Sequence, residues 1–156
     1  MYNLINQYAS TIVRETPLGY VQDYEWLLDN IGPALSQEYK REFRKFWAMN
    51  SARLNHKFYE RYFALLSAPT TQAFTLNQIV DILYDESMRG DGSHSVQFSF
   101  VTKLLHMQNP HVPIYDSQVA AFYFFRPPPA DANLLWGQPN YEQFFRGKWV
   151  TLFCSE

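Results

Sequence analysis

Apolar side chains recur every three to four positions along most of the chain, which is the spacing of one face of an α-helix. Proline and glycine interrupt this pattern, and Pro17, Gly32 and Pro69 each end a predicted helix. No stretch alternates between apolar and polar residues as a half-buried strand does. The pattern predicts seven or eight helices, over residues 2–14, 20–31, 35–50, 52–68, 76–88, 95–108 and 117–125, with a last aromatic-rich helix from Tyr141 onward.

The segments between these helices carry turn and cap signals. Thr75 is expected to cap the helix over 76–88, because its hydroxyl can accept a free backbone N–H. The sequence RGDGSH contains two glycines and predicts a turn, and RPPPADAN predicts an extended connector. The fold class is therefore expected to be all-α, with residues 1–156 forming one compact multi-helix domain. The sequence ends on TLFCSE, which leaves room for further C-terminal helices.

The composition fits a packed domain, and the net charge of the whole chain is close to zero. Hydrophobic residues make up 47% of the 156 residues and charged residues 18%, which argues against disorder. The rings of 13 Phe, 11 Tyr and 4 Trp are expected to fill much of the interior. A formal net charge of −2 means that any nucleic-acid surface must be a local basic patch.

The cysteine count and the hydropathy of the chain indicate where in the cell the protein is expected. Cys154 is the only cysteine, so no disulfide can form within the chain, which fits a reducing environment. No stretch is apolar enough to predict a transmembrane helix, and the N-terminus lacks the pattern of a signal peptide. We expect a protein of the cytoplasm or nucleus that does not enter a membrane. The four histidines are scattered, and neither a metal nor another cofactor is expected.

Lys103 stands out in the helix predicted over 95–108. It and Asp116 are the only two side chains with a full charge between residues 98 and 125. Ser95, Ser99, Thr102 and His106 form a narrow polar stripe on this otherwise apolar helix. A partly desolvated lysine amine loses its proton more readily and can act as a nucleophile. The alternative is that Lys103 extends along the polar stripe to water.

Asp116 follows a loop that contains Pro110 and Pro113 and directly precedes the helix predicted over 117–125. Its carboxylate is therefore placed to cap that helix. A capping carboxylate is held in position and stays ionised, so it can also face a developing cation. His106 and His111 flank the loop, and a structural role is expected for them ahead of contact with a ligand.

The segment SFVTKLLHMQNPHVPIYDSQV resembles the core of the helix-hairpin-helix DNA glycosylase superfamily, and most closely 8-oxoguanine DNA glycosylase-like proteins. In that superfamily a lysine near a helix start is followed by a proline-containing loop and an aspartate, which match Lys103 and Asp116. The resemblance implies base excision from a flipped nucleotide, with lyase chemistry, as in DNA repair. Lys103 would attack the sugar C1′ and Asp116 would support the cationic transition state. The family's hairpin is rich in glycine, whereas SVQFSFVTK contains none.

A second feature is a basic helix face in the sequence QEYKREFRKFW. Apolar rings occupy the other side of this helix, and Arg53, Lys57 and Arg61 add a further basic row. DNA is the expected partner, through the backbone phosphates, and the sequence does not identify a protein partner. Two alternatives stay open: a non-catalytic helical module that binds nucleic acid or protein through this face, and a purely structural domain. The expected DNA-binding residues are Lys40, Arg41, Arg44 and Lys45.

Overall fold

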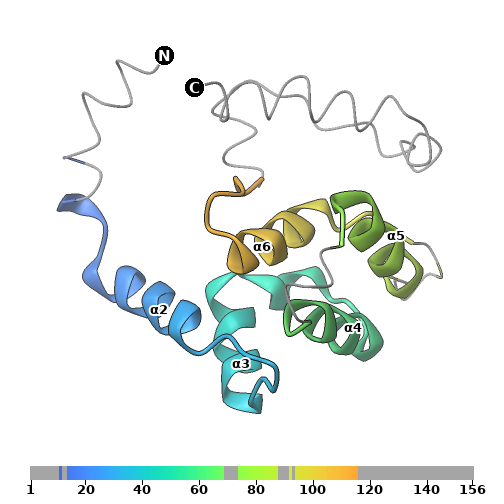
Figure 1. The fold of residues 1–156 in the computed structure, drawn as a ribbon, viewed down its shortest axis with the longest axis horizontal. Helices are drawn as coiled ribbons and strands as arrows, with labels where there is room; N and C mark the ends of the chain where they lie inside the picture. The colour runs from blue at the N-terminus through green and yellow to red at the C-terminus, as the bar shows by residue number, and fades with distance from the viewer. Residues whose placement is uncertain (1–10, 12–13, 69–73, 88–91, 93, 116–156) are drawn as a thin grey trace. The chain divides into compact units, whose positions relative to one another are not determined.

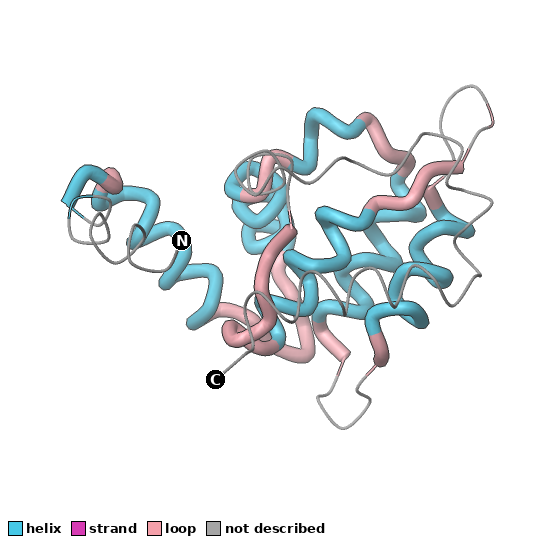
Figure 2. The backbone as a smooth tube through the Cα atoms, turned by 90° about the horizontal axis from the view of Figure 1, so that it is seen from above, coloured by secondary structure: helices cyan, strands magenta, loops and turns pink. Residues whose placement is uncertain are grey.

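The computed structural model describes residues 11, 14–68, 74–87, 92 and 94–115 (Figure 1). Every regular element among these residues is helical, and the described backbone consists of helices and loops (Figure 2). The all-α prediction is confirmed for this part of the chain. The helices are α2 (Leu18–Asp29), α3 (Gln37–Phe46), α4 (His56–Leu66), α5 (Leu76–Glu86) and α6 (Phe98–Gln108), with the short 3₁₀ helix η1 (Met49–Ala52) between α3 and α4.

The predicted helix over 117–125 and the last helix from Tyr141 onward lie outside the described residues, as does most of the predicted helix over 2–14. The chain divides into two compact units, with unit 1 ending at Asn50 and unit 2 beginning at Ser51. This division does not test the expectation of one domain, which stays a prediction. Among the described residues, no helix has both the length and the apolar character needed to cross a membrane.

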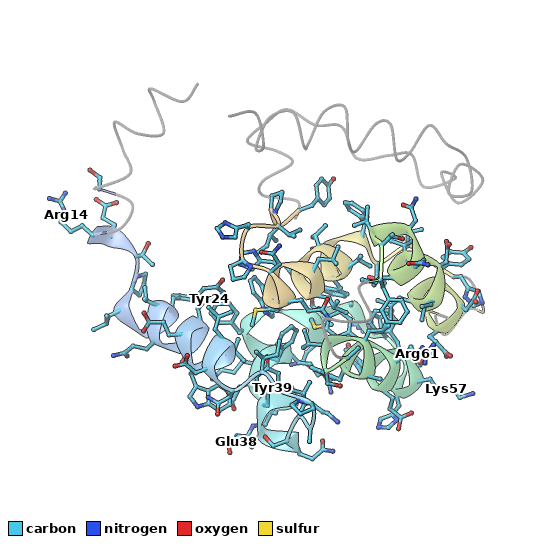
Figure 3. The ribbon with its side chains drawn as sticks, viewed as in Figure 1. Arg14, Tyr24, Glu38, Tyr39, Lys57 and Arg61 are labelled. Atoms are coloured by element: carbon cyan, nitrogen blue, oxygen red, sulfur yellow. The ribbon has the colours of Figure 1, made fainter. Side chains whose placement is uncertain are left out.

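Unit 1 is held together by aromatic rings between α2 and α3. The ring of Tyr24 stacks on that of Phe46, with centroids 6.1 Å apart, and Trp26 stacks on Tyr39 at 6.0 Å. Tyr24 and Tyr39 are labelled in Figure 3. Offset and edge-to-face ring pairs of this kind contribute beyond their buried area. The aromatic face predicted for the sequence QEYKREFRKFW is therefore the face by which α3 packs.

In the described part of unit 2, the helices α4, α5 and α6 pack against one another (Figure 1). α4 buries six of its side chains, among them Phe58, Tyr62 and Leu66. α5 begins with a capping box: the side chain of Thr75 accepts from the backbone of Gln78, and the Gln78 side chain accepts from the backbone of Thr75. The predicted cap at Thr75 is confirmed, because the signal for it is entirely local.

Two predicted helices are shorter than the sequence pattern indicates. The pattern over 35–50 ends as α3 at Phe46, and the pattern over 52–68 starts as α4 only at His56. Between them, Ala48 and Arg53 adopt left-handed backbone conformations, with φ of 53° and 51°. A residue in that region breaks the helical hydrogen-bond ladder, even in a sequence with good helix formers.

Candidate active site

Lys103 lies in the second turn of α6, and its side chain is buried, with 8% of its surface exposed. Most of the Lys103 side chain is therefore enclosed, and its extension along the polar stripe to water stays an alternative. Its ammonium nitrogen Nζ lies 5.5 Å from the centroid of the Phe100 ring, one turn earlier on the same helix. A cation over a ring face is attracted by the ring quadrupole, by about 0.5–2 kcal/mol depending on desolvation.

Phe100 is itself fixed by α4, so the aromatic surface beneath Lys103 belongs to the core of unit 2. The Phe58 ring packs against the Phe100 ring with centroids 6.4 Å apart. The buried hydroxyl of Tyr62 donates a hydrogen bond of 3.0 Å to the Phe100 carbonyl oxygen. This contact joins residues 38 positions apart in the sequence. One side of the Lys103 surroundings is thus built from two packed helices.

The proline-containing loop that follows α6 is bound to another face of the same helix. Thr102, next to Lys103, is 1% exposed. Its Oγ1 accepts a hydrogen bond of 3.0 Å from the backbone N–H of Tyr115. The hydroxyl proton can go to the carbonyl of Ser99 at 3.0 Å or to that of Tyr115 at 3.3 Å. The end of the loop is therefore bound to the residue adjacent to Lys103.

A further hydrogen bond holds the middle of the same loop. His106 Nδ1 lies 2.8 Å from the Val112 carbonyl oxygen, and because a carbonyl only accepts, Nδ1 carries the proton. The structural role expected for His106 is confirmed by this bond. His111 is exposed, and its backbone N–H donates to the side-chain carbonyl of Asn109. In Figure 1 the orange segment after α6 turns back along the helix, as these bonds require.

Asp116 lies outside the described residues, so its pairing with Lys103 stays a prediction. The described chain ends at Tyr115, the residue immediately before it. Ser95, which the sequence pattern included in the polar stripe, lies before the start of α6 and donates its backbone N–H to Ser87 Oγ. The stripe within the helix itself consists of Ser99, Thr102 and His106, of which the last two bind the loop.

The basic face predicted on α3 is present, but its four basic side chains differ in exposure and in their pairing with a carboxylate. Arg41 and Lys45 are exposed, and both pair with Glu42, at 2.9 Å and 3.7 Å. The hydrogen bond from Arg41 and the charge of Lys45 hold the pKa of Glu42 below its ordinary value of 4.5. Lys40 and Arg44 are half-buried, and the Arg44 Nε atom is fully buried. A DNA-binding role for these four residues stays a prediction.

The second basic row lies on unit 2. Arg53, Lys57 and Arg61 are exposed, the last two on α4, where both are labelled in Figure 3. Within the described ranges, none of the three forms an ion pair with a carboxylate. The neighbouring Glu60 pairs instead with His56, at 3.4 Å. This row thus carries more uncompensated charge than the exposed part of the α3 face.

Comparisons of the chain with family models, curated proteins and solved structures find no match. The resemblance to the glycosylase superfamily therefore rests on the segment around Lys103 alone. Among the described residues, no three His, Cys, Asp or Glu side chains gather to hold a metal ion. The chemistry available at this place is that of a largely buried lysine amine beside an aromatic ring.

Two residues of this arrangement were not anticipated from the sequence. The contact of Phe100 with Lys103 could have been predicted, because Phe100 precedes Lys103 by three positions and so lies on the same side of the helix. Tyr115 did not, because its bond to Thr102 and its ring contact with Phe98, at 5.3 Å, depend on how the loop folds back.

Proposed function

We propose that this chain is a DNA base-excision protein of the helix-hairpin-helix glycosylase kind, in which Lys103 is the nucleophile and Asp116 its electrostatic partner. The observation that carries the proposal is the pair of contacts between Thr102 and Tyr115. They join the residue before Lys103 to the residue before Asp116, two residues 13 positions apart. A pair that acts on one sugar has to converge from separate elements in this way.

The burial of Lys103 supports the same proposal. A nucleophile has to be held in position, and a buried side chain has few conformations open to it. The Phe100 ring and the packed helices behind it provide an apolar wall of fixed geometry. An exposed, freely rotating lysine offers neither property.

The proposed reaction begins when Lys103 Nζ attacks the sugar C1′ and the bond from C1′ to the base breaks, with the bonding electrons leaving on the base. The bond from C1′ to the ring oxygen then opens, the oxygen takes a proton, and an imine joins the lysine to the sugar. The Asp116 carboxylate would stabilise positive charge on the sugar during base loss.

Borohydride trapping tests this proposal, because hydride reduces the imine to a stable amine. The parent protein, mixed with a duplex that contains an abasic site, is expected to give a covalent protein–DNA band. Lys103→Gln is expected to give none. At saturating duplex, Lys57→Gln serves as the matched control, since it removes an exposed amine from the same unit, and it should trap as the parent does. A parent protein that traps nothing contradicts the enzyme proposal.

The duplex is proposed to bind through Lys40, Arg41, Arg44 and Lys45. Because Arg44 is half-buried, the variant that best preserves folding is Arg41→Gln with Lys45→Gln, and Arg53→Gln with Arg61→Gln is its matched control. The first variant should weaken binding in a mobility-shift assay and flatten its salt dependence by about 0.9 per lost phosphate contact. A larger effect of the control variant would assign the duplex to unit 2. Binding without trapping would favour the non-catalytic module.

A further inference from the structure

The aromatic ring beside the Lys103 amine is held in place by the packing of α4 against α6. Lys103 Nζ lies over the Phe100 ring, 5.5 Å from its centroid. The Phe58 ring contacts the Phe100 ring, with centroids 6.4 Å apart, and the Tyr62 hydroxyl donates to the Phe100 carbonyl. Phe100 and Lys103 are each only 8% exposed. The ring face is therefore a fixed surface, largely shielded from water, beside the amine.

The proposed reaction changes the charge on the nitrogen that lies over this ring. The amine is neutral when its lone pair attacks C1′, and the nitrogen becomes positive as the bond to C1′ forms and the base leaves with its electrons. The nitrogen then loses a proton, and its lone pair displaces the sugar ring oxygen, which takes up a proton. The product is a protonated imine, in which the nitrogen side of the new bond is again positive.

A ring face attracts positive charge through its quadrupole, and the attraction is stronger where water is excluded. The Phe100 ring therefore interacts more strongly with the nitrogen after attack than before it. Interactions that are stronger in the transition state than in the ground state accelerate the chemical step.

We propose that Phe100 is a catalytic residue, whose ring stabilises the positive charge that Lys103 Nζ acquires when it bonds to the sugar. This inference rests on the function proposed above. From the usual strength of contacts between a cation and a ring, loss of the interaction should slow imine formation by about 2- to 30-fold. The duplex Kd should not change, because the ring is given no contact with DNA.

Fluorinated phenylalanine at position 100 tests the charge effect with little change in shape, because fluorine withdraws electrons from the ring face. The single-turnover rate of borohydride trapping is measured at saturating abasic duplex, at a pH where the rate no longer rises with pH. This choice removes the effect of the ring on the unreactive ammonium form. The rate should fall with each added fluorine. The matched control is fluorinated phenylalanine at Phe63, a buried ring of α4, which should trap as the parent does.

Natural substitutions provide a second test with a readout of position. Phe100→Leu removes the ring and keeps an apolar side chain, whereas Phe100→Tyr keeps the ring. Protons over a ring face are shifted upfield in NMR spectra, so the ε-protons of Lys103 should show this shift in the parent and in Phe100→Tyr, and lose it in Phe100→Leu. Phe100→Leu should slow trapping and Phe100→Tyr should retain most of the rate. The fluorinated series decides if Phe100→Leu fails to fold.

The outcomes separate this inference from the proposed function. If the parent traps the duplex and the fluorinated rings at position 100 do not slow it, the role of Phe100 is wrong while the enzyme proposal stands. Equal losses at positions 100 and 63 would also overturn that role, because they would indicate disturbed packing. An absent upfield shift in the parent would contradict the contact itself. If the parent traps nothing, the enzyme proposal fails, and the role of Phe100 fails with it.

Discussion

The two units of this chain are stabilised in different ways. In unit 1, α2 buries only Leu27 and exposes Leu18, Tyr20 and Val21, and α3 is joined to it through ring contacts. Unit 2 also has ring contacts, such as that between Phe58 and Phe100, but side-chain hydrogen bonds join distant parts of its backbone as well. Tyr62 bonds to Phe100, and Gln108 bonds to the Leu65 carbonyl near the end of α4. Ring contacts tolerate small shifts, whereas a buried hydrogen bond fixes a distance.

The proposed function assigns the chemistry to unit 2. A reacting pair has to be held within a fraction of an ångström, which suits the hydrogen-bonded helices around Lys103. Binding to a charged, repetitive polymer such as DNA needs surface charge more than fixed geometry, and exposed cations occur in both units, on α3 and in the row of Arg53, Lys57 and Arg61. The proposed function uses the two units accordingly, and two pairs of substitutions and one single substitution test the contrast between them.

The largest expected effect compares a leucine in each unit. Leu104, in α6, is fully buried, and Leu18, at the start of α2, is 68% exposed. Leu104→Ala should lower the free energy of unfolding by about 2–5 kcal/mol, because it leaves a cavity in a packed core. Leu18→Ala should change it by less than about 0.5 kcal/mol. Urea denaturation followed by circular dichroism measures both, and equal losses would remove the contrast between the units.

A smaller effect, of opposite sign in the two units, is expected for two buried tyrosines. Tyr62→Phe removes the hydrogen bond to Phe100 and should cost about 1 kcal/mol. The Tyr39 hydroxyl is buried, has no hydrogen-bond partner among the described residues, and its burial raises the pKa of the phenol.

Tyr39→Phe should therefore leave the protein equally or more stable, because an unsatisfied buried hydroxyl is removed. Differences in denaturation midpoint between each variant and the parent provide the comparison. A loss of stability in Tyr39→Phe as large as that in Tyr62→Phe would show that the Tyr39 hydroxyl has a partner.

The smallest effect is expected at Glu42, on the exposed face of α3. Its pKa in the folded protein is lowered, first by the hydrogen bond from Arg41, so its ion pairs stabilise the fold at pH values above 4.5. That contribution is lost as the pH falls through the lowered pKa. The difference in thermal midpoint between the parent and Glu42→Gln should therefore be small at pH 7 and should shrink as the pH falls below 4.5. It should also close in 1 M salt, about the concentration at which exposed pairs are fully screened. A difference that persists in acid would require a different role for Glu42.

Local signals in the sequence predicted local structure well. The Thr75 cap follows from two residues three positions apart, and the apolar surroundings of Lys103 in the sequence indicated a mostly buried helix. The ends of α3 and α4 were misjudged because Ala48 and Arg53 adopt left-handed conformations that their residue types do not favour. The tether from Thr102 to Tyr115 could not be predicted, since it depends on the path of a loop with two prolines.

The central claim, that Lys103 forms the imine, is tested most directly by locating the crosslink. The parent protein is trapped on an abasic duplex with borohydride, the DNA is digested to a short remnant, and tryptic peptides are analysed by mass spectrometry. Lys103 is the only lysine between Arg89 and Arg146. A crosslinked peptide from this part of the sequence therefore identifies Lys103 as the reacting amine. The account predicts the remnant on Lys103, with no tryptic cleavage after it. A remnant on Lys40, Lys45 or Lys57 would contradict it.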